Sequence, residues 1–155
     1  MRQLIAGFAV LAIACAGSET AGNANAAEQS SAAGEEPQAE VQSSEVHEVM
    51  MELVDGSYIY TPLSLTIKVG DTVRWINASG GPHNVAFYAD QIPEGAEDPL
   101  NAAMSNRLGN LNGELLVAPD AVYEIVFAGM PVGDYGYFCL PHEALGMIAG
   151  LTIEQ

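Results

Sequence analysis

A cysteine, a histidine and a methionine fall within nine residues near the end of the chain. They are Cys139, His142 and Met147, spaced Cys-x2-His-x4-Met, and a further histidine, His83, precedes the cysteine by 56 residues. One thiolate, two imidazoles and one thioether are the ligands of an electron-transferring copper centre, with a trigonal His2Cys plane and a weak axial Met. Because His83 is remote in sequence, only a folded domain could complete this set.

The joint pattern is more informative than its members, since a lone histidine or cysteine is usually a structural residue. Zinc would prefer another Cys, His or carboxylate to the thioether of Met147. A nucleophilic pair of Cys139 and His142 is the main alternative without a metal. Two residues on one tight loop are poorly placed for such a pair, and no orienting acid is evident.

The number of histidines limits the activity. The chain has three histidines, and His47 is the one left over from the predicted site. It is expected on the surface of the first strand, and one histidine cannot form a second, substrate-binding copper centre. A site with four protein ligands has no open position for a substrate, so the sequence predicts a one-electron carrier and not an enzyme. A copper chaperone or storage protein with the same ligands is the alternative, and an electron-donating subunit of a reductase is a third.

The chain is strongly acidic. Its 155 residues include twenty Asp and Glu against four Lys and Arg, for a formal net charge of −16. This excludes a nucleic-acid binder, which needs a basic face toward the phosphates. It suits docking to redox proteins with a basic face, such as a cytochrome, a reductase or an oxidase. Solubility of an exported or halophilic protein explains the charge equally well, and both explanations stay open.

The N-terminus has the charge layout of an export signal, with an apolar run too short to span a bilayer. Residues 1–15 are expected to be a lipoprotein signal that ends at Cys15, and cleavage after Ala26 is the alternative. Residues 16–44 lack the apolar side chains needed for a core and predict a disordered tether. We therefore expect an exported protein, periplasmic or on the extracytoplasmic face, with a membrane link only through a lipid on Cys15.

Residues 45–155 change to short alternating runs between turn residues, which is typical of β-strands. A short helical turn is expected around Pro99–Met104. The candidate strands are Val46–Val54, Tyr58–Tyr60, Leu63–Val69, Thr72–Asn77, Asn84–Phe87, Glu114–Val117, Val122–Phe127, Tyr135–Cys139 and Met147–Ile153. This spacing predicts one all-β domain, an antiparallel sandwich or barrel.

Alternation along the strands indicates where the site lies. It places Cys139 at the end of a strand, on the face opposite to Phe138. His142 and Met147 then lie on the loop to the next strand. His83 stands at another strand end, after a Gly-Gly-Pro turn that permits close backbone approach. Two such ends, meeting at one pole of a sandwich, could hold a metal rigidly.

Four segments resemble those of small type I (blue) copper proteins, the plastocyanin and pseudoazurin group of the cupredoxin superfamily. They are Gly70-Asp71-Thr72-Val73, Gly81-Pro82-His83-Asn84-Val85, Ile92-Pro93-Glu94-Gly95-Ala96 and the run from Pro141 to Ile148. The resemblance implies an eight-stranded Greek-key β-sandwich with a mononuclear copper site at one pole. It also implies a function in electron transport.

The same resemblance assigns roles to single residues. His83, Cys139 and His142 would be the equatorial ligands of one copper ion, and Met147 the axial one. The backbone amide of Asn84 would donate to the Cys139 sulfur, and its side chain would tie the two ligand loops together.

In this group the loop histidine is the solvent-exposed port for the electron, here His142. It would lie in an apolar docking patch formed by Pro82, Ala144 and Leu145. Two departures concern docking. Phe138 stands where plastocyanin has a tyrosine beside a second docking site, and Glu143 adds a charge to the ligand loop.

Overall fold

The computed structural model of the protein describes residues 44–155. The signal predictions at Cys15 and Ala26, and all but the last residue of the 16–44 tether, lie outside the described residues. The described elements are β1 (Val46–Val54), β2 (Ser57–Thr61), β3 (Ser64–Lys68), β4 (Thr72–Asn77), β5 (Ala86–Phe87), α1 (Glu97–Ala103), β6 (Val122–Val126), β7 (Gly133–Phe138), the 3-10 turn η1 (Glu143–Leu145) and β8 (Ile148–Glu154).

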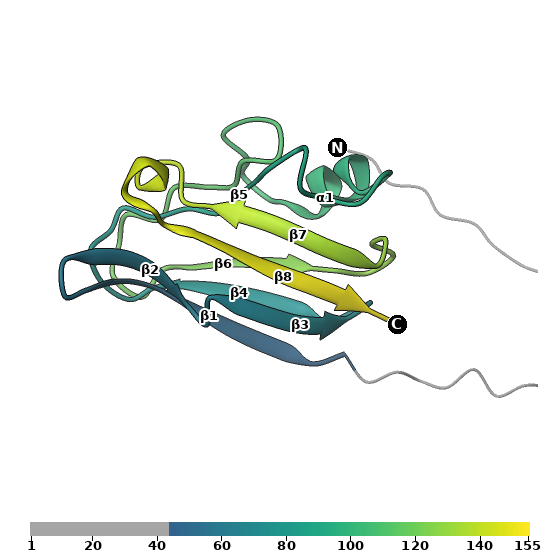
Figure 1. Cartoon of the computed structure of the whole chain (residues 1–155), viewed down its shortest axis with the longest axis horizontal. Coiled ribbons are helices and arrows are strands. Elements are labelled where there is room, and N and C mark those ends of the chain that lie inside the picture. The colour runs from purple at the N-terminus through teal and green to yellow at the C-terminus, as the bar shows by residue number, and fades with distance from the viewer. Residues whose placement is uncertain (1–43) are drawn as a thin grey trace, which may run out of the picture. The chain divides into compact units, whose positions relative to one another are not determined.

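The eight strands form two four-stranded sheets, ordered β2-β1-β4-β6 and β3-β8-β7-β5, that face each other as a sandwich (Figure 1). This confirms the predicted Greek-key sandwich. The sheets are mixed, however, because β1 pairs in parallel with β4 and β3 with β8. Crossovers between the sheets bring these strands together, so the purely antiparallel arrangement expected from strand spacing is wrong at these two pairs.

The core lies between the sheets and follows the period of two along each strand. Trp75 of β4 and Tyr137 of β7 are fully buried and meet edge to face, with ring centroids 5.7 Å apart. Tyr60 of β2 packs on Tyr137 in the same way at 4.9 Å. Aromatic contacts of this kind join the two sheets directly beneath the pole that carries Cys139.

The structure corrects two predicted strands. Glu114–Val117 is not a strand, and of its four residues only Leu116 forms a bridge, to His83. The strand expected at Asn84–Phe87 is reduced to the two residues of β5. The backbone carbonyl of Asn84 accepts a hydrogen bond from the hydroxyl of Tyr60 instead, so the ladder does not continue to this end of the segment.

The helical turn expected around Pro99–Met104 is present as α1, which begins earlier, at Glu97. Acidic side chains in its first turn, Glu97 and Asp98, suit the positive end of the helix dipole. In the described part of the chain, no helix has the length and apolar character needed to cross a membrane.

His47, expected on the surface, is instead partly buried. Its Nε2 atom lies 2.9 Å from Oδ2 of Asp71, whose side chain is only 4% exposed. The carboxylate of Asp71 also accepts hydrogen bonds from the backbone N–H groups of Glu45 and Lys68, at 2.8 and 2.9 Å. These contacts fasten the start of β1 to the turn between β3 and β4.

Candidate metal centre

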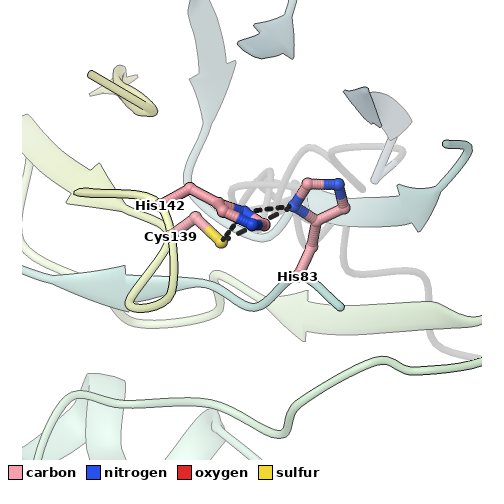
Figure 2. Close-up of side chains that lie close together, drawn as sticks. All are labelled: His83, Cys139 and His142. Carbon is pink, nitrogen blue, oxygen red and sulfur yellow. Dashed lines mark hydrogen bonds between the residues drawn. The ribbon is translucent and has the colours of Figure 1, made fainter. Parts of the chain in front are cut away.

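Three side chains converge where β7 leaves its sheet (Figure 2). The Sγ atom of Cys139 lies 3.6 Å from Nδ1 of His83 and 3.5 Å from Nδ1 of His142, and the two Nδ1 atoms are 3.2 Å apart. Cys139 directly follows β7, and His142 precedes η1, while His83 comes from the segment before β5. The structure thus brings together three of the four predicted ligands.

This triangle fits one metal ion. The centre of a triangle with these sides lies about 2 Å from each corner, which matches the metal–nitrogen and metal–sulfur distances of about 2.0–2.3 Å known for zinc in proteins. The thiolate and imidazole donors suit a soft or borderline metal such as copper. The residues therefore fit a copper ion in the geometry that they already have.

Burial keeps water away from these donors. His83 and Cys139 are 0% exposed, and His142 is 8% exposed. Burial lowers the pKa of both histidines, and for His142 the nearby His83 lowers it further. Burial raises the pKa of the Cys139 thiol, although the backbone N–H groups of Asn84 and His142 partly oppose this. The imidazoles are therefore neutral bases with a free lone pair, and a bound cation would favour the thiolate.

The ring of His83 is oriented by a hydrogen bond on its far side. Its Nε2–H donates to the backbone carbonyl of Ser79 at 2.9 Å, which leaves Nδ1 unprotonated and directed at Cys139. The backbone of His83 is held as well, through two hydrogen bonds with Leu116 at 3.1 and 2.7 Å. This segment therefore presents its ligand atom rigidly.

The loop that carries the other three predicted ligands is closed on itself. The N–H of Cys139 donates to the carbonyl of Met147 at 3.1 Å, and the N–H of Met147 donates to the carbonyl of His142 at 3.2 Å. Gly146, at φ 87°, makes the left-handed turn that ends η1. The side chain of Met147 is fully buried. The loop is thus a compact unit in which the backbone of Met147 is bonded to the residues Cys139 and His142.

Asn84 lies between the two ligand segments and is fully buried. Its Oδ1 atom accepts a hydrogen bond from the N–H of Leu140 at 2.8 Å. Its Nδ2 atom donates to Oδ1 of Asn112 at 2.6 Å and to the carbonyl of Gly113 at 3.3 Å. One side chain therefore links the segment of His83 to the loop of Cys139.

The expected docking patch is exposed. Pro82, Ala144 and Leu145 are all accessible to solvent, and Leu145 is 63% exposed. The exposed Glu143 accepts a hydrogen bond from the hydroxyl of Tyr88 at 2.9 Å. Partial burial, with this carboxylate nearby, raises the pKa of Tyr88 to about 12.

Sequence reasoning missed two tyrosines of β2 at the site. The ring of Tyr58 stacks on the ring of His142, and the hydroxyl of Tyr60 donates to the carbonyl of Asn84 at 2.7 Å. The signal for both was the alternation Tyr58-x-Tyr60 directly after an Asp-Gly turn, which puts both rings on one face of a strand.

A two-sheet Greek-key sandwich with a cysteine and two histidines at one pole defines the cupredoxin class of small copper proteins. Residues 47–154 match the sequence model of a known family, the copper-binding proteins of the plastocyanin/azurin family. The chain belongs to this family. Its cofactor is a copper ion of type I.

Relatives agree with this assignment, and solved structures share the fold. A plastocyanin from Synechococcus sp. is 38% identical over 112 residues, which cover 72% of this chain and 76% of the relative. A plastocyanin from Scenedesmus fuscus is 39% identical over 99 residues, which cover 64% of this chain and 90% of the relative. The fold is shared with oxidised plastocyanin from the fern Dryopteris crassirhizoma, at a TM-score of 0.53 with 24% identity, covering 69% of this chain and 99% of that one. A pseudoazurin from Sinorhizobium has a TM-score of 0.52 with 24% identity, and the match covers 72% of this chain and 75% of the pseudoazurin.

Proposed function

We propose that this protein is an exported one-electron carrier that shuttles electrons between redox proteins. The observation that carries the proposal is the closed triangle of donor atoms from His83, Cys139 and His142, with sides of 3.2–3.6 Å. We assign these residues as the equatorial copper ligands and the buried Met147 as the axial one. With four protein ligands there is no position for a substrate, so the site serves electron transfer and not catalysis.

The contribution of the protein is a rigid, dry cage. The bound copper supplies a one-electron couple between its two oxidation states. The hydrogen bond of His83 to Ser79 and the Asn84 link keep the donor atoms in place when the charge changes. The N–H groups beside the Cys139 sulfur stabilise its thiolate form and influence the potential. Little has to rearrange when an electron moves.

Partners are proposed to dock where His142 approaches the surface, at the patch of Pro82, Ala144 and Leu145. From Glu45 to Gln155 the chain has fifteen Asp and Glu against three Lys and Arg, so the domain is strongly negative. Such a surface attracts the basic face of a cytochrome, reductase or oxidase. The N-terminal sequence supports export to the periplasm or the extracytoplasmic face, with Cys15 as the site of a lipid anchor.

The test is to add Cu(II) to the purified chain and to record voltammetry and resistance to a chelator. A carrier gives fast, reversible one-electron reduction and retains copper against a mild chelator. A chain that releases its copper to that chelator and shows no reversible wave would contradict the carrier function and favour a copper chaperone or store.

A further inference from the structure

The ring of Tyr58 lies flat on the imidazole of His142. The two ring centroids are 3.7 Å apart and the planes differ by 8°. The same tyrosine meets the ring of His83 edge-on, at 6.0 Å and 70°. One side chain therefore touches both histidines of the metal centre, and it comes from β2, which belongs to the opposite sheet.

The backbone of Tyr58 is held firmly. The turn before β2 has two residues with positive φ, Asp55 at 49° and Gly56 at 81°, as in the tight hairpin turns that fix strand register. Tyr58 then pairs with Leu53 of β1. Two residues further on, Tyr60 is buried and bonded to the carbonyl of Asn84. The backbone of Tyr58 is therefore anchored on both sides along its strand, which fixes where its ring starts.

The two histidines are held by different means. Nε2 of His83 is fixed by the carbonyl of Ser79. Nε2 of His142 has no hydrogen-bond partner among residues 44–155, and its loop lies outside both sheets. The stacked ring of Tyr58 is thus the contact that lies flat against the plane of the His142 ring.

We infer that Tyr58 is a positioning residue of the copper site, which keeps Nδ1 of His142 directed at the metal and shields one face of its ring. This inference rests on the proposed function. A stacked aromatic pair contributes specifically through the ring and not through the hydroxyl. Phenylalanine at position 58 should therefore preserve the positioning of His142. Leucine, which is apolar but not aromatic, should not preserve it.

The experiment compares the full chain with Tyr58→Phe and Tyr58→Leu. NMR of the metal-free proteins should show ring protons of His142 shifted upfield in the unchanged chain and in Tyr58→Phe. In Tyr58→Leu the same protons should be unshifted. In competition with a chelator, Tyr58→Leu should bind copper about 3- to 10-fold more weakly, and Tyr58→Phe should stay within about 2-fold of the unchanged chain. Thermal unfolding of the metal-free variants verifies that each is folded.

The outcomes separate this inference from the function. A blue, copper-binding parent chain with a Tyr58→Leu variant of unchanged copper affinity would overturn the positioning role alone. So would unshifted His142 ring protons in the parent chain, a measurement that needs no variant. A parent chain that binds copper without the blue band would overturn the proposed function and this inference with it.

Discussion

The side-chain oxygen of Asn84 accepts a hydrogen bond of 2.8 Å from the backbone N–H of Leu140, the residue that follows Cys139. Asn84 itself follows His83, so this bond joins the two segments that carry the proposed metal ligands. The two residues are 56 positions apart in sequence. The contact therefore defines the spacing of the site more directly than either sheet does.

Replacing Asn84 by alanine should loosen that spacing. The change removes all three hydrogen bonds of a buried side chain and should lower the free energy of unfolding by about 2–4 kcal/mol. Copper affinity should fall about 10- to 100-fold, as for other residues that orient metal ligands. Denaturant unfolding and chelator competition measure the two effects. Asn112→Ala is the matched control: it removes one partner of Asn84 but keeps the Leu140 bond, so copper affinity should change little.

Met147→Leu tests the proposed axial ligand. Leucine is of similar volume but cannot donate electrons to copper, so Cu(II) should lose stabilisation and the reduction potential should rise. The blue colour should persist because the cysteine remains. Voltammetry measures the shift. Met104→Leu, a change at another buried methionine, should leave the potential unchanged. Equal potentials in the two variants would remove Met147 from the ligand set.

Asp71 should make stability depend on pH. Although burial acts in the opposite direction, hydrogen bonds from the N–H groups of Lys68 and Glu45, together with His47, lower the pKa of this carboxyl below its ordinary value of 3.8. Its stabilisation is therefore fully present above that value and is lost as the pH falls through the lower folded-state pKa. Urea unfolding of the metal-free chain from pH 6 downward should show the loss. Asp71→Asn should be less stable near neutral pH, and the difference from the unchanged chain should shrink in acid.

Salt should slow electron exchange with a cationic partner. The negative domain attracts a basic cytochrome at long range, and this attraction is screened within about 10 Å at 0.1 M salt. Stopped-flow rates should fall as ionic strength rises. Glu143→Gln, on the ligand loop, should reduce the rate about 2- to 5-fold at low salt. Glu154→Gln, at the far end of β8, should have a smaller effect. Rates that do not respond to salt would assign the acidity to solubility alone.

Much of the fold follows from sequence because alternation is a local property. The period of two marks β1, β4, β6 and β7 within a residue or two, and it places Cys139 at the end of β7. The ligand loop is equally readable, since Cys139, His142 and Met147 are close in sequence. His83 is remote in sequence, so it could be assigned to the same site only because a copper centre of this kind needs a second imidazole.

Contacts between elements were not readable in the same way. The stack of Tyr58 on His142 depends on how a hairpin of one sheet faces a loop of the other, which no single segment encodes. Glu114–Val117 has the composition of a strand but lies beside irregular backbone at His83, so it forms one bridge. His47 seemed a surface residue because Asp71, its partner, lies 24 positions away.

The visible absorption spectrum after addition of Cu(II) tests the central claim most directly. We predict an intense blue band for the full chain, because the Cys139 thiolate binds copper in the plane of His83 and His142. Cys139→Ser, which replaces the sulfur by oxygen, should lack that band even if it still binds copper. A strongly blue Cys139→Ser protein, or a colourless copper complex of the unchanged chain, would contradict the assignment of the site.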